Sequence, residues 1–154
     1  MSRAFIKESD GDDGDELPEL RVSPHRNLVT ATGLGQIEAT VERLQAALTE
    51  ARAATDRTAI RQHQRDLRYW TERQRTAEVV TVSAATDMVR FGLSVTLKKK
   101  GGERVQYQIV GEDEADPANG KISYVSPIAR LLIGLSEGDV AVLPDGEVEI
   151  LEIG

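Results

Sequence analysis

The sequence predicts an α+β protein: an N-terminal antiparallel α-hairpin coiled coil, then a small β-rich domain with one short helix. Three observations predict it. Apolar residues recur at spacings of three and four between Leu28 and Ala77, they alternate with a period of two from Phe91 onward, and a segment with neither pattern separates the two regions. We therefore expect, in order, an acidic disordered arm, the hairpin, a linker and the β-rich domain, at residues 1–27, 28–79, 80–87 and 88–154.

Composition excludes several classes of site. The 154 residues include no cysteine and two histidines, His25 and His63, so disulfides are impossible and a zinc site made by this chain alone is disfavoured. No apolar stretch approaches the roughly 20 residues that span a bilayer. The N-terminus is acidic and does not resemble a secretory signal. We expect a cytoplasmic protein without a membrane partner.

The net charge of −7 is unevenly distributed. Residues 8–19 contain seven acids and no base, whereas residues 57–75 contain six arginines against Asp66 and Glu72. Such an uneven distribution of charge indicates what the protein binds more than how it folds. The arginines either meet something anionic or form a solvated helix surface. The acidic arm either screens this basic helix or aids solubility.

Two helical segments of about 22 residues carry matching apolar seams. Thr30 is the expected N-cap of the first segment, and Thr55 or Asp56 that of the second. The first seam consists of Leu34, Ile37, Val41, Leu44, Leu48 and Ala51, and the second of Ile60, His63, Leu67, Trp70, Gln74 and Ala77. Two residues per heptad is the narrow pattern of a coiled coil. A short join then predicts an antiparallel hairpin whose arms are roughly 33 Å long at ~1.5 Å per residue.

Polar residues interrupt the second seam. We interpret His63 as a partly exposed seam residue rather than a ligand, Gln74 as a seam residue near the wet end of the rod, and Trp70 as a packing residue. A two-helix hairpin buries a single seam, so it should project as a rod from the domain that anchors it.

The C-terminal region reads as strands with one short helix. Alternating residues predict a hairpin formed by Phe91–Leu97 and Val105–Ile109, joined by a lysine- and glycine-rich turn. The acidic loop at 111–120 lacks the ligand spacing of a calcium site. A strand at Ile122–Val125 precedes Ser126-Pro127, an N-cap followed by proline at the first helical position. The short helix ends at Gly134, and two more strands follow at 139–143 and 147–153.

Several of these motifs resemble a known family. Residues 111–150, "GEDEADPANGKISYVSPIARLLIGLSEGDVAVLPDGEVEI", together with "VRFGLSVTL" at 89–97, are similar to the C-terminal domain of the bacterial Gre transcript-cleavage factors. "NLVTATG" at 27–33 and "LRYW" at 67–70 resemble parts of the family's N-terminal coiled coil. The resemblance covers residues 27–154.

The resemblance implies an FKBP-like C-terminal domain that docks at the rim of the secondary channel of RNA polymerase, and a coiled coil that enters this channel. In such factors, acidic residues at the hairpin tip help to hold a Mg²⁺ ion of the polymerase. Catalysis then belongs to the polymerase, so we expect this chain to be no enzyme and to bind no cofactor beyond that shared Mg²⁺.

The same resemblance indicates which residues meet the partner. The docking surface would comprise Ser126, Pro127, Ile128, Ala129 and Arg130. Contacts with nucleic acid or with the channel, made only within the transcription complex, would come from Arg57, Arg61, Arg65 and Arg68. We expect the protein to act as a monomer.

The hairpin tip departs from the family pattern. The hairpin is shorter by about two turns per arm, or roughly 11 Å, and its tip reads Ala-Ala-Thr-Asp. Asp56, with Glu50 behind it, is the candidate for the tip acid, but Asp56 is also the expected helix cap. A carboxylate displaced by a few ångströms cannot coordinate a metal at ~2.1 Å.

Four functions remain open on the sequence. They are a polymerase-binding regulator or inhibitor without cleavage stimulation, a cleavage factor that uses Asp56, a prolyl isomerase, and a general nucleic-acid binder. An isomerase would need an aromatic-lined cleft, and the domain offers Phe91, Tyr107 and Tyr124. A sequence pI near 4.9 argues against a general nucleic-acid binder.

Overall fold

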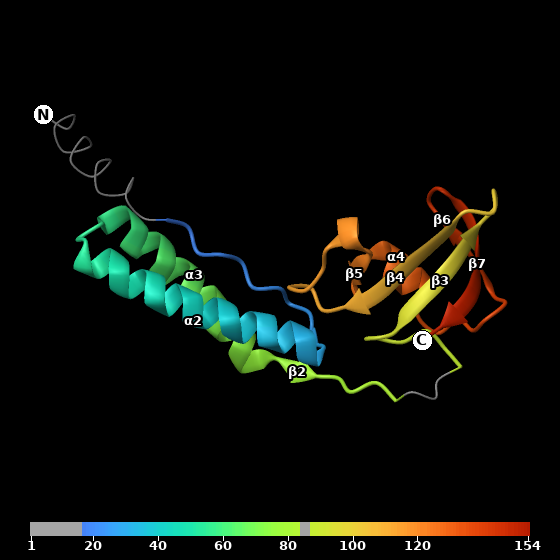
Figure 1. Cartoon of the computed structure of the whole chain (residues 1–154), viewed down its shortest axis with the longest axis horizontal. Coiled ribbons are helices and arrows are strands. Elements are labelled where there is room, and N and C mark those ends of the chain that lie inside the picture. The colour runs from blue at the N-terminus through green and yellow to red at the C-terminus, as the bar shows by residue number, and fades with distance from the viewer. Residues whose placement is uncertain (1–16, 84–86) are drawn as a thin grey trace, which may run out of the picture.

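The computed structural model describes residues 17–83 and 87–154. A helical hairpin and a strand-rich domain lie end to end along the longest axis of the molecule (Figure 1). This confirms the predicted architecture. No helix within the described ranges is both long and apolar enough to cross a membrane.

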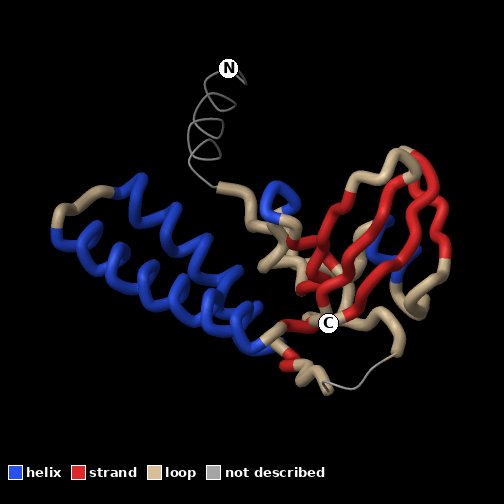
Figure 2. The backbone as a smooth tube through the Cα atoms, turned by 45° about the vertical axis from the view of Figure 1, so that its right-hand side comes forward, coloured by secondary structure: helices blue, strands red, loops and turns tan. Residues whose placement is uncertain are grey.

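The hairpin consists of α2, Ala31–Ala53, and α3, Arg57–Thr76. The Thr30 side chain caps α2 by accepting a hydrogen bond from the Gly33 amide at 2.9 Å, and Asp56 caps α3 by accepting one from Ala59 at 3.1 Å. Thr55 makes the turn between them in the left-handed region, at φ 55°. At ~1.5 Å per residue the two helices are about 35 and 30 Å long, and they run antiparallel (Figure 2).

The seam of the hairpin is buried on one helix and half-buried on the other. On α2 the buried residues are Gly33, Ile37, Val41, Leu44, Leu48 and Ala51. On α3 the expected seam residues Ile60, His63, Leu67 and Trp70 are only partly buried. Such a hairpin keeps one side of α3 in contact with water, as expected for a projecting rod.

The expectation for Gln74 was wrong, because Gln74 is exposed and Arg73 is 1% exposed in its place. At this end of α3 the helix packs on the C-terminal domain as well as on α2. The buried position of α3 is therefore Arg73 instead of Gln74, and the arginine pairs there with carboxylates of the C-terminal domain. Leu34 is likewise half-buried, whereas its neighbour Gly33 is buried.

The C-terminal domain is built on a five-stranded sheet in the order β5-β4-β3-β7-β6. Pairing is antiparallel except between β4 and β5. The strands are β3 Ser94–Lys99, β4 Arg104–Val110, β5 Lys121–Ser123, β6 Val140–Leu143 and β7 Gly146–Ile153. A one-turn 3₁₀ helix, η1, covers Pro117–Asn119. A separate parallel pair, β1 Leu28–Val29 with β2 Glu78–Val79, ties together the two ends of the hairpin region.

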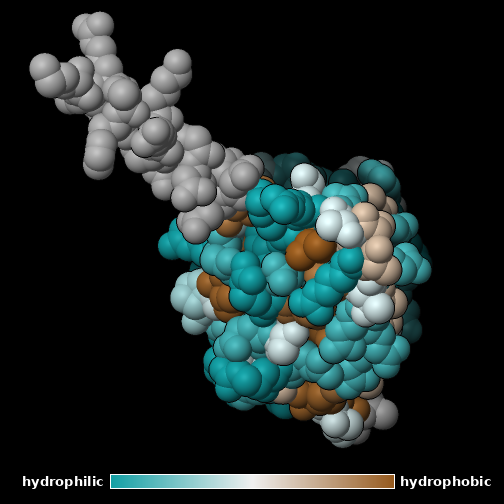
Figure 3. Space-filling model, turned by 90° about the vertical axis from the view of Figure 1, so that its left-hand side faces the viewer, coloured by the Kyte–Doolittle hydropathy of each residue, from teal (hydrophilic) through white to brown (hydrophobic). Residues whose placement is uncertain are grey.

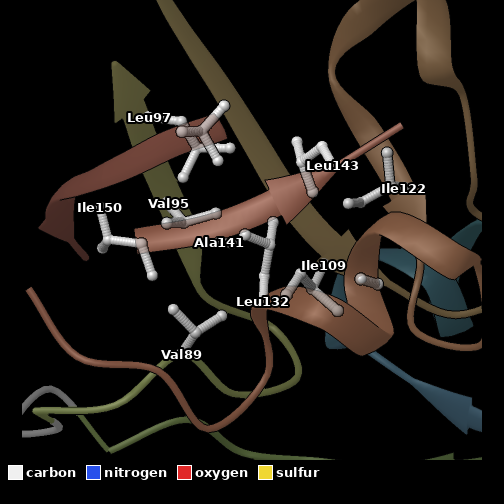
Figure 4. Packing of buried hydrophobic residues seen from close by; sticks show 11 residues of the cluster. Val89, Val95, Leu97, Ile109, Ile122, Leu132, Ala141, Leu143 and Ile150 are labelled. Atoms are coloured by element: carbon white, nitrogen blue, oxygen red, sulfur yellow. The ribbon is translucent and has the colours of Figure 1, made fainter. Parts of the chain in front are cut away.

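The core of this domain lies between the sheet and α4, Pro127–Leu132. Ala129 and Leu132 of α4 are fully buried against sheet residues such as Val95, Leu97 and Ile109 (Figure 4). Each fully buried valine, leucine or isoleucine side chain stabilises the fold by about 1.5–3 kcal/mol relative to an exposed one. The core therefore fixes the position of the short helix, and with it the surface around Ser126 and Pro127.

The first strand of the domain begins later than expected. Phe91 and Gly92 form a turn, with Gly92 at φ +88°, and a Cβ on Gly92 would lie 2.4 Å from Cγ2 of Val82. The start of the region expected as a linker, at Val82, thus packs close to this turn. Residues 84–86 lie outside the described residues, as do residues 1–16 of the expected acidic arm. Residues 17–27 do not stand apart from the hairpin, because Asn27 is buried and Glu19 contacts α3.

Candidate functional site

The hairpin tip presents its one candidate acid as a helix cap. A carboxylate oxygen of Asp56 accepts the Ala59 amide, as the sequence predicts. Glu50 lies exposed on the last part of α2. Viewed toward the hairpin end, the surface is mainly hydrophilic with isolated apolar spots (Figure 3). Within the described ranges, no group of three or more His, Asp or Glu side chains is arranged to hold a metal ion.

Four arginines follow one side of α3 at spacings of four, four and three, which places them on neighbouring turns. We call this set, Arg57, Arg61, Arg65 and Arg68, the arginine face. Arg57 and Arg68 are exposed, while Arg61 and Arg65 are half-buried. Arg65 pairs with Asp66 at 2.9 Å, and Arg68 pairs with Glu19 of the arm. The charge is thus concentrated on one flank of the rod and partly neutralised.

A shallow groove of about 520 Å³ lies at the junction of the two helices, beside Arg68. It is lined by Leu48, Arg52, Gln64, Leu67, Arg68, Thr71 and Glu72. Its walls combine an apolar floor with two arginines.

The expected docking surface is formed by the start of α4. Ser126 caps the helix by accepting the Ala129 amide at 3.3 Å, and Pro127 occupies the first turn with its ring exposed. Arg130 is exposed and Ile128 half-buried. Ala129 corrects the expected surface: it is 0% exposed, so its side chain holds the helix on the sheet and is not available to a partner.

Two apolar residues extend this surface. Leu131 and Ile133 are 45% and 39% exposed. Leu131 lies four residues after Pro127 and therefore on the same side of α4. Neither residue was predicted from the sequence, although three consecutive large apolar residues, Leu131 to Ile133, are more than a one-sided helix of this length can bury.

The two domains meet at a buried arginine. The Arg73 guanidinium donates from Nε to Oδ2 of Asp113 at 2.6 Å and from Nη2 to Oδ1 of Asn27 at 2.9 Å. Asn27 in turn donates to the Arg73 carbonyl at 2.7 Å. Because Asp113 belongs to the loop after β4, these bonds connect the base of the hairpin to the C-terminal domain. We call Asn27, Arg73 and Asp113 the joint.

Neighbouring groups complete the joint. The Tyr69 hydroxyl donates to Asp113 at 2.8 Å, and burial, reinforced by this carboxylate, raises the pKa of Tyr69 to about 12. Glu112 Oε2 is buried without a hydrogen bond and lies 3.7 Å from Arg73 Nη2. Two carboxylates therefore share one guanidinium, which is itself buried.

Backbone contact also fixes the two domains. A Cβ on Gly111 would lie 2.3 Å from the Leu28 carbonyl oxygen, and one on Gly33 would lie 2.6 Å from Oε1 of Glu114. Thr30, the cap of α2, also hydrogen-bonds Glu114. Two features of the sequence point to this contact between the domains. They are the Glu112-Asp113-Glu114 run after a strand and an arginine, Arg73, one position from the expected seam. Neither feature shows which residue the other one pairs with.

Residues 84–154 match the family described as transcription elongation factor, GreA/GreB, C-terminal. The C-terminal domain is homologous to that of the Gre factors. The resemblance found in the sequence motifs of the C-terminal domain is thereby confirmed.

Curated relatives agree with this assignment. The chain is 54% identical over 77 residues to transcription elongation factor GreA of Anaeromyxobacter sp. (strain K), which is 47% of this chain and 46% of that one. It is 44% identical over 100 residues to transcription elongation factor GreB of Neisseria meningitidis serogroup B, which is 61% of each chain. The chain thus spans about half to three fifths of the length of the curated relatives it matches.

Solved structures give a weaker similarity. GreA factor homolog 1 of Thermus thermophilus is 23% identical with a TM-score of 0.40, over 84% of this chain and 99% of that one. The GreA/GreB factor of Nitrosomonas europaea is 20% identical with a TM-score of 0.39, over 82% and 97%. Scores at this level carry no functional argument.

Proposed function

We propose that this protein binds RNA polymerase through its C-terminal domain, inserts its hairpin into the secondary channel and regulates elongation. The observation that carries this proposal is a GreA/GreB C-terminal domain joined at a buried arginine to a projecting helical rod. A rod fixed in this way transmits the position of the docked domain to the hairpin tip about 30 Å away. The protein would act as a cytoplasmic monomer that catalyses no reaction of its own.

The docking surface proposed here is Ser126, Pro127, Ile128 and Arg130, extended by Leu131. Arginine is among the residues that dominate interfaces. The exposed Pro127 and Leu131 beside Arg130 can lose water on binding without leaving polar groups unpaired. Ala129 supports this surface from below.

We further propose that cleavage stimulation is weak or lacking, so that the protein acts as a regulator or inhibitor. The Asp56 carboxylate already accepts the Ala59 amide, and reorienting it toward a shared Mg²⁺ would cost the helix its cap, about 1 kcal/mol. The competing proposal, a cleavage factor that uses Asp56, makes an opposite prediction. It requires that stalled complexes release short 3′ RNA fragments faster when the protein is added.

Binding tests the docking proposal. Immobilised core polymerase should retain the intact protein, and Pro127→Ala should weaken binding by roughly fivefold or more, as for a central interface residue. Pro144→Ala, in the exposed β6–β7 turn, is the matched control and should bind like the wild type. Absence of binding by the intact chain, or equal loss in both variants, contradicts the proposed surface.

Transcription from arrested complexes tests the effect. We expect slower elongation without added RNA cleavage, and the same result with Asp56→Asn. RNA cleavage that depends on Asp56 would establish the competing proposal instead. A proline-peptide isomerisation assay separates the remaining enzyme hypothesis, which has little structural support because Phe91 and Tyr124 pack edge to face with ring centroids 5.6 Å apart.

A further inference from the structure

The described part of the acidic arm already contacts the basic helix. Both carboxylate oxygens of Glu19 lie 3.1 Å from Nε of Arg68, and Nη2 of Arg68 also donates to Glu19. Asn27, at the other end of this segment, is bonded to Arg73 near the base of α3. The arm therefore follows α3 from its base toward the hairpin tip as it is traced from Asn27 back to Glu19 (Figure 1).

Charge is complementary beyond this contact. Six acids and no base occupy residues 8–16, which precede Glu19: Glu8, Asp10, Asp12, Asp13, Asp15 and Glu16. On α3, the three arginines between Arg68 and the tip lie at intervals of three or four residues, about 5–6 Å apart along the axis. The acids thus begin where the described arm meets the arginine face.

The chain is long enough for this contact. From Arg68 to Arg57 is roughly 16 Å along the helix axis. The eleven residues from Glu19 back to Glu8 can span roughly 36 Å when extended. Acids at 12–16 can therefore reach every member of the arginine face without strain on the Glu19 contact.

We propose that residues 8–16 are an intrachain ligand of the arginine face, Arg57, Arg61, Arg65 and Arg68, and compete there with nucleic acid. Tethering beside the site gives the arm a high effective concentration, on the order of millimolar. The described contact, Glu19 with Arg68, is exposed to solvent and therefore screened by salt. Under the proposal, a denser polyanion displaces the arm. This inference concerns the arm alone and holds whether or not the docking surface on α4 binds polymerase.

A spin label reports the contact directly. Because the chain contains no cysteine, Ser9→Cys gives one labelling site within the acidic segment of the full-length protein. At low salt, we expect the amide signals around Arg57 and Arg61 to be strongly broadened. They should recover near 1 M salt, where the Debye length is about 3 Å.

The matched control keeps the tether and removes four of the six acidic charges of residues 8–16. It carries the same label together with Asp10→Asn, Asp12→Asn, Asp13→Asn and Asp15→Asn. Broadening around Arg57 and Arg61 should be largely lost in this variant. Equal broadening in both proteins overturns the proposal, because the tether alone would then account for the position of the label. Absence of broadening in both overturns it as well, because the label would then not lie near Arg57 and Arg61.

Competition is measured with a fluorescent single-stranded oligonucleotide. At low salt, the variant with the four amides should bind on the order of tenfold more tightly than the wild type, because the arginine face is freed for phosphates. Adding Arg57→Gln and Arg61→Gln should abolish this gain. Equal affinity of wild type and amide variant refutes the competition, even where the spin label shows contact.

Discussion

Two arginines on α3, five residues apart, each bind a carboxylate from outside the hairpin, yet their settings are opposite. The side chain of Arg73 is 2% exposed and that of its partner Asp113 10%, whereas those of Arg68 and Glu19 are 57% and 61% exposed. The first pair joins two domains and the second holds an arm. The difference shows how one residue type can serve either as a fixed joint or as a displaceable contact, depending on access of water.

The physical basis is desolvation. A buried ion pair gains little net stability when it forms, but removing one partner leaves an uncompensated buried charge. An exposed pair loses little when it is broken, because water solvates both groups. Mutation should therefore separate the two contacts sharply.

Arg73→Met should produce the largest effect. Asp113 and Asn27 would lose their partner inside the joint, and we expect the free energy of unfolding to fall by about 3–5 kcal/mol. Urea denaturation measures this change. Arg75→Met is the control, because Arg75 pairs with Glu72 in solvent, and its unfolding midpoint should stay close to that of the wild type. Similar destabilisation by both variants contradicts the role of the joint.

Gly111→Ala tests the backbone side of the same joint. Its Cβ would lie 2.3 Å from the Leu28 carbonyl oxygen, so the two domains must separate slightly, at a cost of about 1–3 kcal/mol. Gly101→Ala is the matched control, since nothing lies within 4 Å of a Cβ there. The difference between their unfolding free energies is the measurement, and a difference near zero would mean that the contact yields without strain.

The sequence predicted the parts of the molecule that depend on neighbouring residues. Thr30, Asp56 and Ser126 were all recognisable as caps, because a cap needs only its own side chain and an amide three residues away. The strands β3 to β7 likewise follow from alternation and turn residues. Even the later start of β3, at Ser94 instead of Phe91, has a local cause, the turn at Gly92.

The joint could not be predicted in the same way. Arg73 and Asp113 are 40 residues apart, and nothing local distinguishes Arg73 from the other arginines of α3. The expected seam residue was Gln74, because the heptad pattern takes no account of a second domain packed at the helix end. Ala129 shows the same limit: its motif indicates a docking helix, but only packing on the sheet shows that its side chain is buried.

Tyr69 tests whether the joint keeps water out. Its pKa of about 12 implies that Tyr69 titrates above the ordinary tyrosine range in a spectrophotometric titration of the folded protein, in a step that Tyr69→Phe identifies. A raised pKa stabilises the fold below the ordinary value near 10, and this contribution is lost as the pH rises from about 10 toward 12. Tyr69→Phe should remove the late step and lose about 1 kcal/mol with the hydrogen bond to Asp113. Persistence of that step would assign it to another tyrosine.

Glu19→Gln should have the smallest effect on stability. The hydrogen bond from Arg68 holds the pKa of Glu19 below its usual value, so the contact is present near neutral pH and weakens as acidification protonates the carboxylate. Because both groups remain solvated when they separate, the unfolding midpoint should barely move, in contrast to Asp113→Asn in the joint. What should change is the salt dependence of oligonucleotide binding, since the arginine face gains one unpaired cation. A loss of stability comparable to that of Asp113→Asn would mean that the arm is a structural part of the hairpin rather than a displaceable ligand.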